Sequence, residues 1–135
     1  MSLHPRETAP AHAWPVLLCC ADPARVHEVE RVLASWPVPV ALTVVGSAMP
    51  ALRHSLVQPL RLVIVDWALG GPSGQAVVRQ LARLRPALPV LAFDERSLVG
   101  TADQVLTWPW DELATVLDHW LMRVEDSGSP QGPTS

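Results

Sequence analysis

Short, solidly apolar runs alternate along the chain with stretches in which apolar residues recur every three or four positions. The apolar runs have the length of β-strands, and we assign strands to residues 16–20, 40–45, 60–65, 88–93 and 105–107. The helical spacing predicts helices within residues 23–36, 48–57, 77–84 and 111–124. Proline and glycine residues punctuate the boundaries between these segments.

Strands that alternate with helices favour an α/β fold, with a doubly wound parallel sheet and right-handed crossovers. The predicted strands are continuously apolar, which agrees with helices covering both faces of the sheet. In such sheets ligands bind beyond the carboxyl ends of the strands, where the strand order reverses. This rule selects the residues at or just after the predicted strand ends, which are Cys20, Ala21, Asp22, Asp66, Asp94 and Trp108.

The 135 residues suffice for a single domain. We expect this domain over residues 14–124, with flexible tails over 1–13 and 125–135, because neither end shows a periodic apolar pattern. No apolar run approaches the roughly 18 residues of a membrane span. The N-terminus also lacks the pattern of a signal peptide, so we expect a cytoplasmic protein with no membrane partner.

The composition excludes several kinds of chemistry. The formal net charge is −3, all 10 basic residues are arginine, and lysine, asparagine and tyrosine are absent. A P-loop lysine, a Schiff-base lysine and a catalytic tyrosine are therefore impossible. The chain has no excess of basic residues, so we expect no nucleic-acid partner. The adjacent Cys19 and Cys20 should point to opposite faces of a strand, so we expect two buried thiols and no disulfide.

Four segments, taken in order, resemble the receiver domain of two-component response regulators, the CheY-like family. The resemblance covers residues 16–124 and is carried by Val16–Pro23, Leu62–Gly74, Leu88–Phe93 and Ala102–Trp110. It implies a flavodoxin-like sheet of five parallel strands in the order 2-1-3-4-5. It also implies two-component signal transduction, in which an aspartate takes a phosphoryl group from a kinase histidine with the help of Mg²⁺.

By this resemblance, Asp66 stands at the phosphoacceptor position and is the candidate catalytic residue. Asp22, Asp66 and the carbonyl group of Ala68 would form a weak or absent Mg²⁺ site. We therefore expect no resident cofactor, with Mg²⁺ binding at low affinity as the exception. For Asp66 the alternative is an inherited acidic residue that no longer reacts.

The chain departs from the family pattern at four pocket positions. Cys20 and Ala21 stand where the family has an acidic pair, and Asp94 stands where it has threonine or serine. Trp108 replaces the family's lysine, and its indole either covers the pocket or packs in an ordinary way. Asp94 either joins a rearranged cation site or caps a helix.

The segment between the last two predicted strands is short. Residues 94–104 separate them, which leaves room for about one helical turn after the loops. The family's fourth helix should therefore be shortened or missing. Beside this gap, Trp108, Trp110 and Met122 could form an exposed patch for a partner or a second copy of the chain. The alternative for Trp110 is packing against the final helix.

These observations favour an atypical single-domain receiver that acts through protein–protein contacts, with phosphorylation impaired and no enzymatic activity. The expected partner is a signalling protein such as a histidine kinase, with a homodimer as a further option. The first alternative is a working phosphoacceptor that receives a phosphoryl group on Asp66. A weaker alternative is a flavodoxin-like module that binds a small molecule, although no glycine-rich phosphate loop follows the first strand.

Overall fold

The computed structural model describes residues 13–68, 73–95 and 107–128. Five strands form its sheet, and they are β1 (Trp14–Cys19), β2 (Val40–Val45), β3 (Leu62–Asp66), β4 (Val90–Asp94) and β5 (Thr107–Pro109). The helices are α1 (Pro23–Ala34), α2 (Ala48–Val57), α3 (Ser73–Leu84) and α4 (Leu113–Gly128), and a short 3₁₀ helix η2 (Trp110–Glu112) leads into α4. Among the described residues, no helix is both long and apolar enough to cross a membrane.

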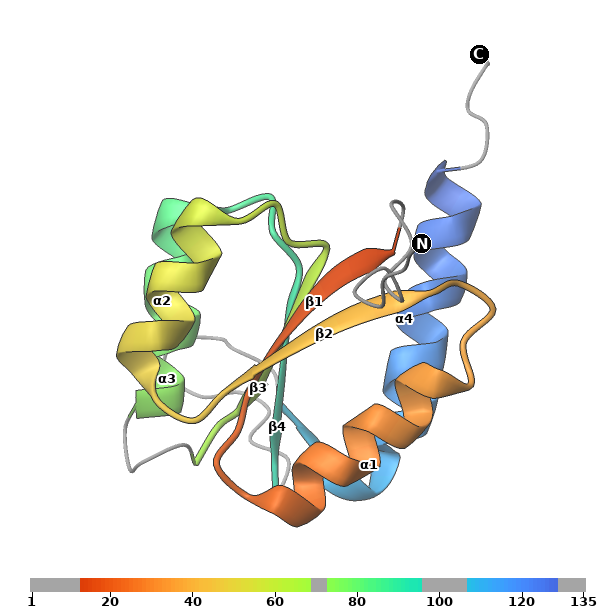
Figure 1. Ribbon diagram of the computed structural model, residues 1–135, viewed down its shortest axis with the longest axis horizontal. Coiled ribbons are helices and arrows are strands. Elements are labelled where there is room, and N and C mark those ends of the chain that lie inside the picture. The colour runs from red at the N-terminus through yellow and green to blue at the C-terminus, as the bar shows by residue number, and fades with distance from the viewer. Residues whose placement is uncertain (1–12, 69–72, 96–106, 129–135) are drawn as a thin grey trace, which may run out of the picture.

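The five strands are all parallel and follow the order β2-β1-β3-β4-β5. The predicted fold class and strand order are therefore confirmed. The strand order reverses at β1, because β1 lies between β2 and β3 although β2 follows it in sequence (Figure 1). Cys19 at the end of β1 is in register with Val65 in β3, so the residues that follow both strands meet at the same edge.

Two helical layers cover the sheet, with α1 and α4 on one face and α2 and α3 on the other (Figure 1). Successive residues of β1 point alternately into the two layers: Leu18 packs under α1 and α4, and Leu17 packs under α2 and α3. Cys19 and Cys20 follow the same alternation, and both are buried free thiols. The prediction that they lie on opposite faces as small core residues is confirmed.

Some predicted boundaries are wrong by a few residues. β3 and β4 each begin two residues later than expected, because turns bonded through the amides of Leu60 and Leu88 precede them. α4 continues to Gly128, so the C-terminal boundary drawn at residue 124 falls inside a helix. Of the tails expected over 1–13 and 125–135, residues 1–12 and 129–135 lie outside the described residues. The prediction that the family's fourth helix is shortened or missing concerns residues 94–104, of which 96–104 also lie outside them.

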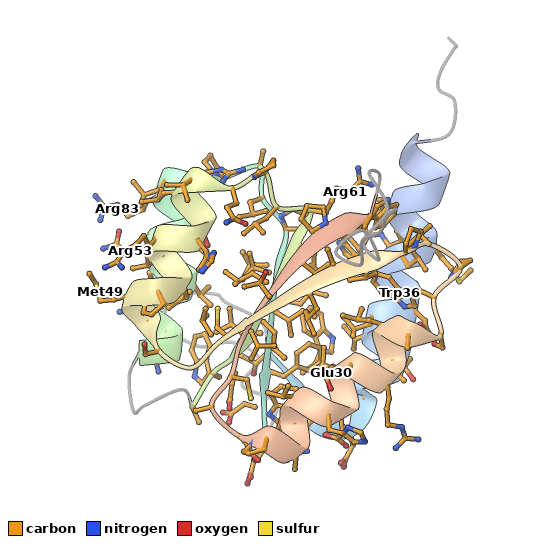
Figure 2. The ribbon with its side chains drawn as sticks, viewed as in Figure 1. Glu30, Trp36, Met49, Arg53, Arg61 and Arg83 are labelled. Atoms are coloured by element: carbon orange, nitrogen blue, oxygen red, sulfur yellow. The ribbon has the colours of Figure 1, made fainter. Side chains whose placement is uncertain are left out.

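Three tryptophan rings pack together where β1 begins. Trp36 stacks on Trp120 with ring centroids 6.0 Å apart, and Trp14 meets both rings edge-on. The indole Nε1 of Trp36 donates a hydrogen bond to Asp118 at 3.0 Å, and the guanidinium of Arg61 lies 4.0 Å from the ring centroid of Trp14. Trp36 and Arg61 lie at the same end of the sheet in Figure 2. Aromatic packing therefore closes the amino end of the sheet.

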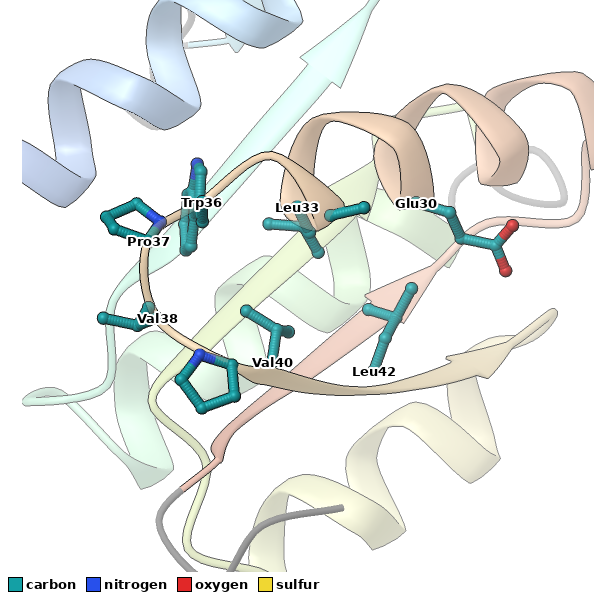
Figure 3. Close-up of a pocket in the computed structure, with 9 residues that line it drawn as sticks. Glu30, Leu33, Trp36, Pro37, Val38, Val40 and Leu42 are labelled. Atoms are coloured by element: carbon teal, nitrogen blue, oxygen red, sulfur yellow. The ribbon is translucent and has the colours of Figure 1, made fainter. Parts of the chain in front are cut away.

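A hollow of about 370 Å³, lined mostly by residues of apolar type, lies next to this aromatic cluster, between the end of α1 and edge strand β2. Leu33, Trp36, Val40 and Leu42 line it, and the carboxylate of Glu30 stands at one rim (Figure 3). Its position is away from the strand ends at which the sequence analysis places the functional residues. A separate, polar cleft occupies those strand ends.

Candidate functional site

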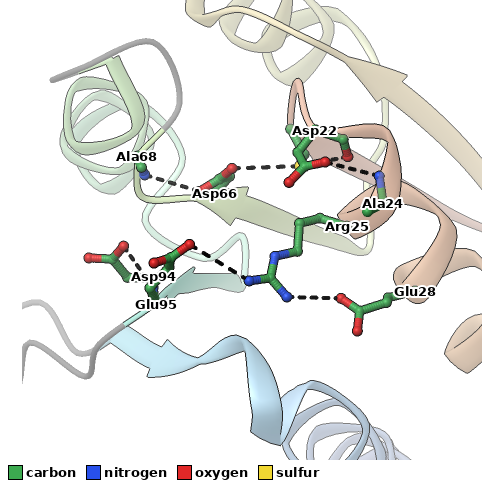
Figure 4. A network of polar contacts seen from close by, with 9 residues as sticks. Asp22, Ala24, Arg25, Glu28, Asp66, Ala68, Asp94 and Glu95 are labelled. Carbon is green, nitrogen blue, oxygen red and sulfur yellow. Dashed lines mark hydrogen bonds and ion pairs between the residues drawn. The ribbon is translucent and has the colours of Figure 1, made fainter.

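A cleft of about 390 Å³ lies at the carboxyl ends of β1, β3 and β4. Four of the residues predicted for the site line it, namely Asp22, Asp66, Ala68 and Asp94. The lining also includes Arg25 and Glu95 (Figure 4), together with Trp110, and none of the three was predicted for the pocket. The fold thus brings together carboxylates from three separate strand ends and adds one arginine from α1.

Asp66 is the last residue of β3, and both of its carboxylate oxygens accept hydrogen bonds. Oδ1 accepts from the backbone amide of Ala68 at 3.1 Å, and Oδ2 accepts from the thiol of Cys20 at 3.6 Å. Burial raises the pKa of the Asp66 carboxyl, and the nearby charge of Asp94 raises it further, whereas the two hydrogen bonds and Arg25 lower it. The net result is a carboxyl group that holds its proton more tightly than an ordinary aspartic acid.

Cys20 directly follows β1, and its side chain is buried against Asp66. Its thiol also lies 3.7 Å from the carbonyl oxygen of Asp22. Burial is the main reason that the pKa of Cys20 is raised to about 11. At neutral pH the side chain is therefore a neutral thiol that donates to the carboxylate of Asp66.

Asp22 has a structural partner of its own at the start of α1. It is the N-cap residue, and its Oδ1 accepts a hydrogen bond from the amide of Ala24 at 3.0 Å. Pro23 follows as the first helical residue, where its missing amide costs nothing. The charge at this position therefore caps a helix, in agreement with the residue preferences of N-cap positions. The neighbouring Ala21 has no ligating side chain.

Arg25 supplies positive charge to the cleft from the first turn of α1. Its Nη1 lies 3.2 Å from Glu28, and its Nη2 lies 3.9 Å from Glu95 (Figure 4). The guanidinium also lies 5.1 Å from the ring centroid of Trp110, within the range of a cation–π contact. Sequence reasoning missed Arg25, although its position three residues after the capping Asp22 was the available signal.

Asp94 ends β4 in register with Pro109 of β5. Its Oδ1 accepts a hydrogen bond from the backbone amide of the next residue, Glu95, at 2.8 Å. The carboxylate is half-buried and raises the pKa of Asp66 by repulsion.

The predicted exposed patch of Trp108, Trp110 and Met122 requires a correction. Trp110 is only 4% exposed and stacks on Phe93 with centroids 5.1 Å apart, because η2 turns its ring inward at the end of β5. Trp108 is half-buried with its ring centroid 6.3 Å from that of Phe93. Trp110, and not Trp108, contributes the indole that lines the cleft. Met122 is exposed on α4, and its role in an interface stays a prediction.

The donor groups at the cleft fit a magnesium ion poorly. Mg²⁺ requires nearly octahedral oxygen ligands and usually takes one or two carboxylates that are free to bind it. Here Cys20 is a neutral thiol, Asp22 is engaged as a helix cap, and Asp66 has a raised pKa. Among the residues that the structure describes, no three His, Cys, Asp or Glu side chains are grouped so that they could hold a metal ion.

Comparison with solved structures identifies receiver domains as relatives in fold. A receiver domain protein (CheY-like) from Methanospirillum hungatei JF-1 superposes with a TM-score of 0.67 and 13% identity, covering 86% of this chain and 99% of the other. The non-phosphorylated receiver domain of the stress response regulator RcsB from Escherichia coli gives a TM-score of 0.68 at 13% identity, covering 86% and 95%.

A third similar structure is the receiver domain of a sensor histidine kinase from Pseudomonas aeruginosa PAO1, with a magnesium ion coordinated in its active site cleft. Its TM-score is 0.63 at 20% identity, and the match covers 82% of this chain and 98% of the other. No protein-family model and no curated protein matches the sequence. The chain thus has the fold of CheY-like receiver domains.

Proposed function

We propose that this chain is a receiver-type module of two-component signalling in which phosphoryl transfer to Asp66 is impaired, and that it acts through protein contacts. The CheY-like fold supports the signalling class. One observation carries the impairment: the Asp66 carboxylate faces a neutral thiol and a second carboxylate, where the family has metal ligands and a lysine. The module has no enzymatic activity in this proposal.

The electrostatics of the reaction explain why this arrangement is unfavourable. The transition state for phosphoryl transfer depends on neutralisation of the charge on the phosphoryl oxygens. The product would add roughly two negative charges beside Asp94. Arg25 is the one cation among the described residues that line the cleft, and Glu28 and Glu95 share its charge. Every 1.36 kcal/mol lost costs about tenfold in rate, so a few such losses slow the reaction by orders of magnitude.

The proposal is tested by adding Mg²⁺ and beryllofluoride, a phosphoryl mimic, while tryptophan fluorescence is recorded. Trp110 lines the cleft and serves as the reporter. We expect no saturable change, because the mimic needs both a bound cation and a positive partner for its fluorides. A saturable response that needs both additions would contradict the proposal. A Trp110→Phe variant establishes whether any response arises at the cleft.

A variant that restores the family's residue types in the pocket tests the assignment of these positions. Replacing Cys20→Asp, Ala21→Asp and Trp108→Lys together restores the family's residue types at the three positions. The triple variant should bind Mg²⁺ saturably, because it gains two carboxylates at the end of β1. The matched control is Cys20→Asn, Ala21→Asn and Trp108→Met, which has similar side-chain sizes without the charges. If the two variants bind Mg²⁺ equally, the assignment of these positions is wrong.

The working phosphoacceptor is retained as a second candidate because of Arg25. Its guanidinium lowers the pKa of Asp66, so it interacts favourably with negative charge there. If Asp66 accepts a phosphoryl group from acetyl phosphate, Arg25→Ala should abolish the reaction and Arg25→Lys should retain part of it. If acetyl phosphate phosphorylates the two variants equally, Arg25 does not support the reaction, and the working phosphoacceptor loses its supporting observation.

A further inference from the structure

Acidic and basic residues are distributed unequally between the two helical layers. α2 and α3 contain no Asp or Glu, while Arg53 lies on α2 and Arg83 on α3. The layer formed by α1, η2 and α4 mixes both signs and includes the acids Glu28, Glu30, Asp111, Glu112 and Asp118. In the sequence between Arg31 and Phe93, Asp66 is the one acidic residue. The α2–α3 layer therefore presents positive charge to solvent.

The same layer exposes large apolar side chains. Of the six large apolar side chains that are exposed among the described residues, all but Met122 lie on β2, α2 or α3. Those on the two helices are 50–72% exposed, and they are Met49 (66%), Leu56 (52%), Val57 (72%) and Leu84 (50%). Single exposed apolar residues are ordinary, but large ones gathered on one layer indicate an interaction surface.

The helices hold these side chains as one surface. Met49, Arg53 and Leu56 follow the spacing of one helix face. Figure 2 shows Met49 and Arg53 pointing away from the sheet on the same side as Arg83. The guanidinium of Arg85, just after α3, donates to the carbonyl groups of Ser55 and Gln58 at the end of α2. We name the set Met49, Arg53, Leu56, Val57, Arg83 and Leu84 the α2–α3 surface.

We propose that the α2–α3 surface binds an acidic amphipathic helix of a partner protein. Apolar side chains of that helix pack on Met49, Leu56 and Leu84, and its carboxylates face Arg53 and Arg83. Recognition of a helix through apolar anchors with complementary charge at the rim is a recurring binding mode. The inference deepens the proposed function, because it names the surface and the partner chemistry of the protein contacts.

Two other occupants fit the surface less well. A nucleic acid would bind through its phosphates and would leave the exposed methionine and leucine side chains without a favourable contact. A second copy of the chain would have to bring its mixed-charge α1–α4 layer against this one. Such a head-to-tail contact between unlike surfaces forms a ring or an open filament and not a two-fold dimer.

The test measures binding to the full chain by fluorescence anisotropy. The probe is a fluorescein-labelled helical peptide with glutamate on one face and leucine on the other. We expect saturable binding that weakens about tenfold or more in Arg53→Glu/Arg83→Glu and in Met49→Ser/Leu56→Ser. Arg31→Glu on α1 is the matched control for the charge reversal, and it should bind the peptide as the unaltered chain does.

Three results would overturn the inference. One is equal binding of a peptide in which lysine replaces every glutamate. Another is tighter binding of a single-stranded oligonucleotide that is lost in Arg53→Glu/Arg83→Glu. The third is a dimer, seen by sedimentation, that the same variant abolishes. The α2–α3 variants leave the Asp66 cleft unchanged, so the two claims can fail separately. Peptide binding that the surface variants do not weaken would overturn this inference alone, whereas a saturable response to Mg²⁺ and beryllofluoride would overturn the proposed function.

Discussion

The amino end of the sheet is closed by three tryptophan rings, whereas the carboxyl end holds a cleft of carboxylates and one arginine. At the amino end, Trp36 is buried, stacked on Trp120 and hydrogen-bonded to Asp118. At the carboxyl end, Asp66 has a raised pKa and lies near the like charge of Asp94. One end gains stability from aromatic packing, and the other keeps groups that are unfavourable to bury together.

This difference indicates that the amino end of the sheet contributes more to the stability of the fold than the carboxyl end does. Packing of apolar surface does not depend on pH or on a bound ion, whereas a carboxylate cluster depends on both. The similar receiver domain from Pseudomonas aeruginosa coordinates a magnesium ion in its cleft, whereas here Cys20 donates a hydrogen bond to Asp66. This hydrogen bond stabilises the Asp66 carboxylate without a bound ion, in agreement with the proposed action through protein contacts.

The largest expected effect is at the amino end. Trp36→Ala removes the stack on Trp120 and leaves Asp118 without its indole donor. We expect a loss of about 3–5 kcal/mol in the free energy of unfolding, as for other large aromatic truncations in cores. Urea denaturation followed by far-ultraviolet circular dichroism measures it. A loss below that of Asp22→Ala at the other end would contradict the comparison.

A second change strains the carboxyl end sterically. A Cβ atom on Gly74 would lie 2.4 Å from the backbone oxygens of both Asp66 and Trp67, and backbone atoms cannot easily give way. We expect Gly74→Ala to cost about 1–3 kcal/mol, because α3 must shift away from the end of β3. Thermal unfolding measures the cost. Gln75→Ala on the same turn is the control, and an equal cost in both would show that the close approach is not limiting.

The helix cap at Asp22 gives a smaller effect. Asp22→Ala removes the acceptor for the amide of Ala24 and should cost about 1 kcal/mol. Asp22→Asn keeps the acceptor and removes the charge, so it should be close to the unaltered chain in stability. Chemical denaturation of both variants measures the difference. If Asp22→Asn is as destabilised as Asp22→Ala, the charge and not the hydrogen bond is what matters at this position.

The smallest expected effect concerns the pH dependence of stability. The folded carboxyl of Asp66 has a pKa raised above its ordinary value of 3.8, so the folded state binds its proton more tightly than the unfolded state does. Stability from this group is therefore fully present below pH 3.8 and falls as the pH rises through the folded pKa. Asp66→Asn removes this loss.

The Asp66→Asn variant should thus gain stability relative to the unaltered chain at neutral pH. The gain should vanish at about pH 3, where Asp66 of the unaltered chain is protonated in both the folded and the unfolded state. Unfolding free energies at the two pH values measure it. The opposite result would be a variant that loses stability relative to the unaltered chain when the pH is raised from 3 to neutral. It would show that the ionised Asp66 carboxylate stabilises the fold through favourable contacts in the cleft.

The fold could be predicted from the sequence because its signals are local. Solid apolar runs and helical spacing predicted all five strands and the helices α1 to α4, and the errors lie in their boundaries. Besides the turns before β3 and β4 and the end of α4, β1 begins at Trp14 rather than at residue 16, and β5 continues to Pro109 although the prediction ended at residue 107. The meeting of Asp22, Asp66 and Asp94 was also predictable, since parallel strands bring their carboxyl ends to one edge.

Arg25 and Trp110 show what the sequence could not provide. The direction of Arg25 depends on how α1 packs beside β4, because Glu95 and Trp110 are its partners and both are distant in sequence. The burial of Trp110 depends on η2, a single 3₁₀ turn that swings the ring onto Phe93. Such short turns and long-range contacts carry no periodic pattern in the sequence.

The most direct test of the central claim is the intact mass of the chain after incubation with acetyl phosphate and Mg²⁺. The account predicts that the unaltered chain keeps its mass, because Asp66 lacks the cationic surroundings that phosphoryl transfer requires. A gain equal to one phosphoryl group that disappears in Asp66→Asn would contradict it.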